Sequence, residues 1–262
     1  MITEISGDKY NMIKRFLYIF LICVCFVFGS CGCSEVASEE EHKIINIRGI
    51  NIEIIPSVYE NNLKKLDNIQ NFGEEITNVY ISVSGDEEKR NRIMDEIKCI
   101  SDEICIGADN DLEKAKRISK WTAENLSYDR DRAANGVDTE LISLESILYN
   151  GYRTTCGGHA NMVSALCAAQ GIYCVNLRGG TVSSGNTHSD LANIPTNHEW
   201  NGVYIDKKWY FLNSTWASER YYENGEYGND GSYLECYELF GFDEMSAEHR
   251  IDIAEQRFAE KK

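Results

Sequence analysis

The stretch Tyr152-Arg-Thr-Thr-Cys-Gly-Gly-His-Ala-Asn161 decides how the rest of the chain is interpreted. From this cysteine onward, apolar residues recur at helical spacing until Gly171, so Cys156 is predicted to stand at the N-terminus of a helix. Unpaired backbone N–H groups and the helix dipole favour an anion at that position. We therefore expect a lowered pKa for the Cys156 thiol, which would make it a nucleophile.

Two polar residues farther along would complete a thiol-based catalytic set. His198 begins a predicted strand over 198–205, and Asn213 lies in a second predicted strand over 209–216. If the connecting turn has two or four residues, these two side chains are diagonal neighbours on one face of the hairpin. A three-residue turn would place them on opposite faces. With a turn of two or four residues, His198 can take the thiol proton, and Asn213 Oδ1 can accept a hydrogen bond from the other ring nitrogen.

The overall composition limits the partners of the protein. The chain has 262 residues, 43% of them hydrophobic, which is enough for a sizeable core. Its net charge of −16 argues against a nucleic-acid partner, because a phosphate backbone requires a basic surface.

The N-terminal residues have the features of a targeting segment. Two basic residues precede an apolar run over 16–28, which is too short to span a bilayer but suits the core of a signal peptide. We therefore expect residues 1–30 to be a signal peptide of the lipoprotein type. An ordinary cleaved signal, an uncleaved anchor and a cytosolic protein are the alternatives.

Small residues just before Cys31 resemble the lipobox of bacterial lipoproteins, in which the cysteine is lipidated. Cys33 is a competing site. A lipid on Cys31 would hold the protein at the extracytoplasmic face of a bacterial cell membrane. The polar residues 31–43 would then act as an acidic tether.

Apolar periodicity predicts the remaining elements. Strands are expected at 44–55, 77–84 and 172–177, helices at 86–104, 111–126 and 143–149, and loops at 128–138, 179–195 and 221–233. A final helix is expected from about Ser246 to the end of the chain.

The cysteines and histidines leave other interpretations open. Cys99 with Cys105, or Cys167 with Cys174, could form disulfides in an exported protein, although buried small apolar residues are the favoured interpretation. No Cys-x-x-Cys pair is present, so no structural zinc is expected. A metal site on Cys156 and His159, completed by His188 or Cys174, is an alternative. The remaining ligands of such a site lack a suitable spacing in the sequence. For His188 the alternatives are solvent exposure and a substrate contact.

Residues from about 109 to 250 resemble the transglutaminase-like superfamily. The resemblance lies in six segments: Asn125-Leu-Ser-Tyr-Asp129, Cys156-Gly-Gly-His-Ala160, Ala165-Leu-Cys-Ala-Ala-Gln-Gly-Ile172, His198 to Trp209, Tyr210-Phe-Leu-Asn-Ser-Thr-Trp216 and Glu244-Met-Ser-Ala-Glu-His-Arg250. Cys156 and His198 match the family's nucleophile and base. The family usually has Asp where this chain has Asn213. An amide can still orient an imidazole, as in papain-like sites.

This resemblance implies an α+β fold with a papain-like, transglutaminase-like core. The nucleophile helix packs on an antiparallel sheet, and a small N-terminal strand-strand-helix extension precedes the core. The expected division is a signal peptide at 1–30, a tether at 31–43, the extension at 44–107 and the catalytic domain at 108–262.

The expected function is that of an exported, thiol-dependent acyl-transfer enzyme. It would be a peptidase, an amidase or a transglutaminase-like acyltransferase that acts on peptide or isopeptide amides through a thioester on Cys156. The implied partners are a peptide or protein substrate and the membrane that holds the lipid anchor, and no cofactor or metal is required. The alternative is a catalytically weak or inactive surface binding or scaffold module of the same fold, which Asn213 favours.

Overall fold

The computed structural model describes residues 43–71, 73–136, 139–182 and 187–258, which belong to one compact unit spanning residues 42–262. The expected signal peptide, Cys31 and all of the tether before Lys43 lie outside the described residues. Within the described ranges, no helix is both long and apolar enough to cross a membrane.

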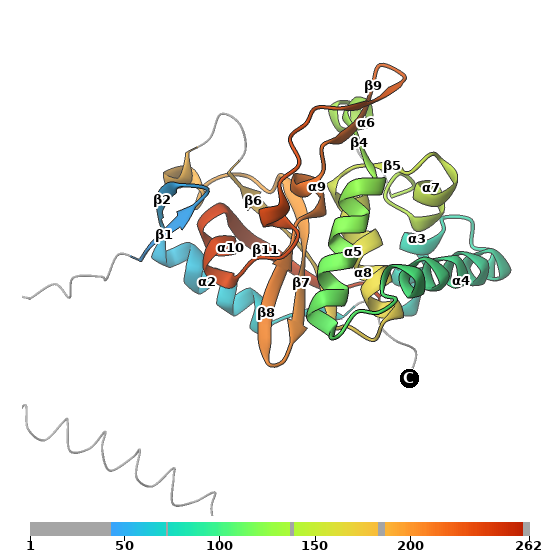
Figure 1. Cartoon of the computed structure of the whole chain (residues 1–262), viewed down its shortest axis with the longest axis horizontal. Helices are drawn as coiled ribbons and strands as arrows, with labels where there is room; N and C mark the ends of the chain where they lie inside the picture. The colour runs from blue at the N-terminus through green and yellow to red at the C-terminus, as the bar shows by residue number, and fades with distance from the viewer. Residues whose placement is uncertain (1–42, 72, 137–138, 183–186, 259–262) are drawn as a thin grey trace, which may run out of the picture. The chain divides into compact units, whose positions relative to one another are not determined.

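A five-stranded sheet forms the centre of this unit (Figure 1). Its strand order is β3 (Gln70–Asn71), β11 (His249–Gln256), β6 (Cys174–Thr181), β7 (His198–Ile205) and β8 (Lys208–Leu212). Neighbouring strands are antiparallel except for β3, which runs parallel to β11. The fold is therefore α+β with a largely antiparallel sheet, as the sequence predicts.

The expected C-terminal helix is wrong. The helix α10 (Phe242–Glu248) ends where β11 begins, and β11 then pairs with β6 over most of its length. Ile251 and Ala254 of β11 are buried in a core cluster with Val175 and Leu177 of β6. Pairing with β6 and this burial decide that the segment is a strand. Local periodicity cannot reveal a strand partner so far away in the sequence, and the prediction therefore failed.

Helices cover both faces of the sheet. The helices α4 (Glu87–Ile104), α5 (Asp111–Asn125) and α8 (Cys156–Ala169) lie on one side, and α2 (Pro56–Asp67) and α10 lie on the other (Figure 1). Both α4 and α5 contact α8, which also packs on β7 and β6. The side chains of α8 are consequently buried on nearly every face of the helix.

The N-terminal extension differs from the expected strand-strand-helix. Residues 44–55 form a hairpin of β1 (Ile44–Ile47) and β2 (Ile50–Glu53), closed by Arg48 and Gly49 at positive φ. Residues 77–84, predicted as a strand, belong largely to the helix α3 (Glu74–Ile81). This helix buries Ile81 in the main core cluster, a contact that the alternating sequence pattern does not reveal.

A second, smaller sheet leads into α8. Its order is β10 (Glu226–Asn229), β9 (Arg220–Glu223), β4 (Ser127–Asp129) and β5 (Arg153–Thr154), so segments expected as loops contribute short strands. Tyr128 pairs with Thr154, two residues before Cys156. The remaining described elements are the helices α6 (Arg130–Asn135), α7 (Leu144–Tyr149) and α9 (Ser214–Ala217), with 3-10 turns at His188–Asp190 and Glu235–Tyr237.

Candidate functional site

Cys156 is the first residue of α8, as the sequence predicts. Its side chain is partly buried. The backbone N–H groups of Glu199, Gly157 and Cys156 itself lie against the sulfur, where they favour the thiolate. Because Glu199 directly follows His198, the thiol lies beside the peptide bond that joins these two residues of β7. The hydrogen bonds of the described residues include none between the Cys156 thiol and the His198 ring.

The expected low pKa of this thiol is wrong. Burial raises the pKa of Cys156 to about 11, and the Glu199 carboxylate acts in the same direction. The backbone N–H groups oppose these effects, but they are weaker. A helix N-terminus stabilises an anion by only about 0.3–2 kcal/mol, which desolvation easily exceeds. Neither the Glu199 carboxylate nor the burial of the thiol is visible in the local pattern that predicts the helix.

The hairpin of β7 and β8 has the register that the site requires. Gly202 pairs with Phe211 and Ile205 with Lys208, so the turn consists of Asp206 and Lys207 alone. Both turn residues have positive φ, 50° and 64°, which is typical of a two-residue hairpin turn that matches the twist of the strands. The register expected for a turn of two or four residues is therefore confirmed, and the turn has two.

Asn213 lies just beyond the end of β8, and not within a strand that continues to residue 216. Its side chain caps α9, where Oδ1 accepts a hydrogen bond from the backbone N–H of Trp216. This is a common role of asparagine before a helix. The same oxygen lies 3.0 Å from His198 Nε2. The structure thus brings His198 and Asn213 together.

The His198 ring has one defined tautomer in this arrangement. An amide oxygen only accepts, so Nε2 carries the proton and Nδ1 holds the lone pair. Burial lowers the pKa of His198 to about 4, although the Asn213 hydrogen bond favours the protonated ring. The Trp216 ring stacks on the imidazole at 5.3 Å between centroids. At pH 7 the thiol and the imidazole are therefore both neutral.

His249 contacts the other end of the Asn213 side chain, a contact that the sequence analysis missed. Its Nε2 lies 3.0 Å from Asn213 Nδ2, and the residue is fully buried. Burial and the neighbouring His198 lower the pKa of His249 well below its ordinary value. His249 belongs to the motif that ends at Arg250, which is a signal that could have identified it. The helix expected from about Ser246 gives this histidine no place beside His198.

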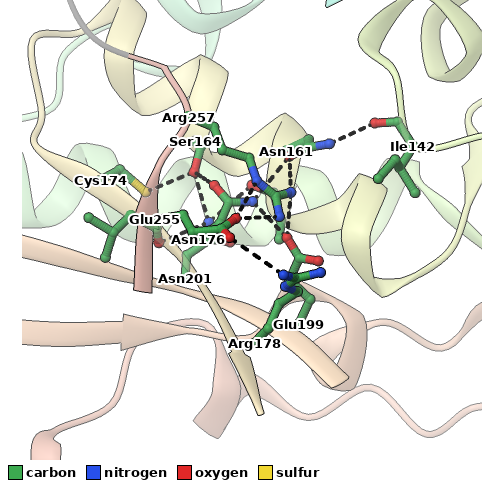
Figure 2. Close-up of polar contacts among 12 residues, drawn as sticks. Ile142, Asn161, Ser164, Cys174, Asn176, Arg178, Glu199, Asn201, Glu255 and Arg257 are labelled. Carbon is green, nitrogen blue, oxygen red and sulfur yellow. Dashed lines mark hydrogen bonds and ion pairs between the residues drawn. The ribbon is translucent and has the colours of Figure 1, made fainter. Parts of the chain in front are cut away.

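Glu199 connects the site to a buried polar network (Figure 2). Its Oε1 accepts from Asn176 Nδ2 at 3.0 Å and forms an ion pair with Arg257 Nη1 at 2.6 Å. Arg257 also pairs with Glu255, and Nη1 donates to Asn161 of α8 at 2.8 Å. Burial raises the pKa of Glu199, whereas Arg257 lowers it. The network joins α8, β6, β7, β11 and the residue after β11 to Glu199, whose backbone N–H lies against the Cys156 sulfur.

The other residues singled out from the sequence have structural surroundings. His159 is buried, its Nδ1 lies 3.5 Å from Ser214 Oγ, and burial lowers its pKa to about 3. His188 lies 4.0 Å from Glu248. No group of three or more His, Cys, Asp or Glu residues in the described ranges could hold a metal ion. The described cysteines are all free, so neither suggested disulfide is formed.

Part of the sequence is similar to known proteins. The sequence model of the transglutaminase-like superfamily matches residues 98–214. Mouse kyphoscoliosis peptidase is 30% identical over 111 residues, which cover 42% of this chain and 16% of that protein. Hillarin of Drosophila melanogaster is 29% identical over 113 residues, which cover 41% of this chain and 13% of that protein. A solved TGase structure aligns with 74% of this chain and 48% of its own, at 17% identity and a TM-score of 0.40.

Residues 98–214 therefore match the sequence model of the transglutaminase-like superfamily. The chain spans only about one sixth of the mouse relative that it matches. The matched residues include Cys156, His198 and Asn213 but end before β11, which supplies His249.

Proposed function

We propose that the protein is a thiol-dependent acyl-transfer enzyme that acts on peptide or isopeptide amides, with Cys156 as nucleophile, His198 as base and Asn213 as the residue that orients the base. The observation that carries the proposal is the hydrogen bond between His198 Nε2 and Asn213 Oδ1 at 3.0 Å. It leaves the lone pair of Nδ1 available to the thiol, next to the peptide bond against which the sulfur lies.

The reaction starts from a neutral pair. As the sulfur attacks the amide carbonyl carbon, the thiol proton moves to His198 Nδ1 and the carbonyl oxygen becomes an oxyanion. The Cys156 backbone N–H at the start of α8 is the donor that would stabilise this charge. The C–N bond then breaks, and the imidazolium returns its proton to the leaving amine. A thioester on Cys156 remains.

The second half of the reaction regenerates the thiol. Water or an acceptor amine attacks the thioester while His198 Nδ1 takes its proton, and the sulfur leaves and is reprotonated. Water gives hydrolysis, and an amine gives a new amide. Throughout both halves Asn213 Oδ1 accepts from Nε2, which keeps the proton-accepting nitrogen directed at the reacting atoms.

The test is release of amine and acid from peptide amide substrates, and incorporation of a labelled primary amine, by the full chain. We expect activity in the wild type, none in C156A and a loss of about 1,000-fold or more in H198A. N213A should retain partial activity. Equal rates for wild type and C156A would refute the proposal.

The alternative is a binding or scaffold module that has the fold without turnover. The neutral resting pair favours it, because a thiol with a pKa of about 11 is almost entirely protonated at pH 7. If wild type, C156A and N213D are all inactive and bind the same peptides equally well, this alternative holds.

We also propose that the protein is exported and anchored through a lipid on Cys31, on the strength of the apolar run 16–28 and the small residues before that cysteine. The mass of the mature N-terminal peptide tests this. A diacylglyceryl group on Cys31 that is lost in C31A supports the anchor, and an unmodified N-terminus refutes it.

A further inference from the structure

His249 is a buried histidine in apolar surroundings. It is 0% exposed, and its ring centroid lies 4.8 Å from that of Trp200, 4.7 Å from that of Trp216 and 5.8 Å from that of Phe240. An imidazole in such a place loses its hydration, and the loss is offset only by hydrogen bonds. Its Nε2 contacts Asn213 Nδ2. The Met245 backbone carbonyl acts on the ring as a hydrogen-bond acceptor, which raises the pKa of His249 against the larger lowering by burial.

The chemistry of the amide fixes the direction of that bond. An amide nitrogen can only donate, so Asn213 Nδ2 donates and His249 Nε2 accepts with its lone pair. The proton of the neutral His249 ring is therefore on Nδ1. At the other end, Asn213 Oδ1 receives N–H groups from His198 and from Trp216 at 3.0 and 3.3 Å. The Trp216 N–H can only donate, so it requires Oδ1 at its end of the amide, and His249 fits the other end as an acceptor when its proton is on Nδ1.

We propose that His249 is a positioning residue: its unprotonated Nε2 holds the Asn213 amide with Oδ1 toward His198, and thereby sets the tautomer of the base. The catalytic consequence of this inference rests on the proposed function, but the hydrogen-bond arrangement does not. His249 acts through Asn213 and touches no reacting atom.

The reversed amide shows why the orientation matters. If Asn213 were flipped, Nδ2–H would face His198 Nε2, which would then have to accept. The His198 proton would move to Nδ1, the nitrogen that must receive the thiol proton. A base in that tautomer cannot act in the first step, so any population of the flipped amide is inactive.

The same geometry explains why this chain has Asn at a position where the family usually has Asp. A carboxylate at 213 would direct an oxygen lone pair at the lone pair of His249 Nε2. To avoid this repulsion, the His249 proton must move from Nδ1 to Nε2, or the ring must become charged in an apolar pocket. His249 and Asn213 therefore fit each other as acceptor and donor.

The arrangement can be tested by measuring which ring nitrogens carry protons. In the uniformly ¹⁵N-labelled full chain, NMR correlations between ring protons and nitrogens distinguish the two tautomers. We expect His198 protonated at Nε2 and His249 protonated at Nδ1 in the wild type. In N213D, His249 should gain a proton at Nε2. A wild-type His249 protonated at Nε2, or ring nitrogen shifts unchanged in N213D, would overturn the inference.

Two substitutions of His249 separate positioning from packing. H249Q keeps an acceptor near the place of Nε2, whereas H249L fills the pocket without one. The His198 tautomer should stay uniform in H249Q and become mixed in H249L, and kcat should fall by about tenfold more in H249L than in H249Q, as expected for one lost hydrogen bond. Equal tautomer populations in the two variants would refute the role of His249.

The two readouts distinguish this inference from the proposed function. If His198 and His249 have the predicted tautomers but the protein shows no turnover, the inference stands and the enzymatic role is removed. Turnover with His198 protonated at Nε2 but His249 also protonated at Nε2 would remove the inference and leave the proposed function standing.

Discussion

Replacement of Arg257 by methionine should strongly destabilise the protein. The arginine side chain is only 2% exposed and lies 2.6 Å from the Glu199 carboxylate. At an effective dielectric constant of about 20, a pair at that distance attracts by about 6 kcal/mol. The variant also avoids the burial of the guanidinium, so the net cost is about 3–5 kcal/mol, as for other buried pairs that lose one partner. That is a large part of the roughly 5–15 kcal/mol that holds a domain folded.

The assay is urea unfolding followed by circular dichroism, with the free energy of unfolding taken from the midpoint and the slope. The control is R130M, because Arg130 also has two carboxylate partners but is 40% exposed, and its loss should cost no more than about 1 kcal/mol. R257M combined with E199Q should be more stable than R257M alone, since the uncompensated carboxylate is gone.

The pH dependence of R257M gives a further check. Arg257 lowers the pKa of Glu199 and burial raises it, so removal of the arginine raises the pKa further. A folded carboxyl with a raised pKa binds more protons than the unfolded one, and stability is lost as the pH rises through that pKa. The cost of R257M should therefore be smaller at pH 5 than at pH 8. A cost no larger than that of R130M, or one independent of pH, would refute the reasoning.

Three further changes test other parts of the structure. Alkylation of Cys156 by iodoacetamide, followed by mass spectrometry of its peptide, should accelerate with pH until about 11, whereas a constant rate from pH 5 to 8 would indicate a thiolate. G158A should lower the free energy of unfolding by about 1–3 kcal/mol, because the added methyl would lie 1.8 Å from the Thr154 hydroxyl. G157A, whose added methyl would lie no closer than 3.2 Å to another atom, should cost less in the same thermal or urea unfolding assay. The Asn62 amide donates to the His249 carbonyl and accepts from the Ile251 N–H, both in β11. N62L leaves these two backbone groups unsatisfied and should lower the free energy of unfolding by about 1–3 kcal/mol for each. A total loss below about 0.5 kcal/mol would contradict this.

Much of the local structure could be predicted from the sequence because it depends on neighbouring residues. The helix over 111–126, the helix that begins at Cys156 and the strand over 198–205 each follow from short patterns, and the structure confirms them to within a residue. The register of the hairpin was predictable as a choice between turn lengths. The turn of Asp206 and Lys207 settles that choice in favour of the site.

The parts that failed depend on contacts between distant segments. The strand β11 carries His249 into the site only because it pairs with β6, and nothing local to residues 249–256 requires that pairing. The pKa of the Cys156 thiol depends on Glu199 and on burial, which act across β7 and α8. Asn213 was correctly placed next to His198, but its role as the cap of α9 was hidden by the apolar pattern around it.

The most direct test of the account is to trap the acyl-enzyme. The full chain is mixed with an activated amide or ester, quenched in acid within one turnover, and its mass and peptides are measured. The account predicts one acyl group on Cys156, absent in C156A and formed much more slowly in H198A. Acylation spread over the exposed Cys99 and Cys236 instead, or an equal rate in H198A, would contradict it.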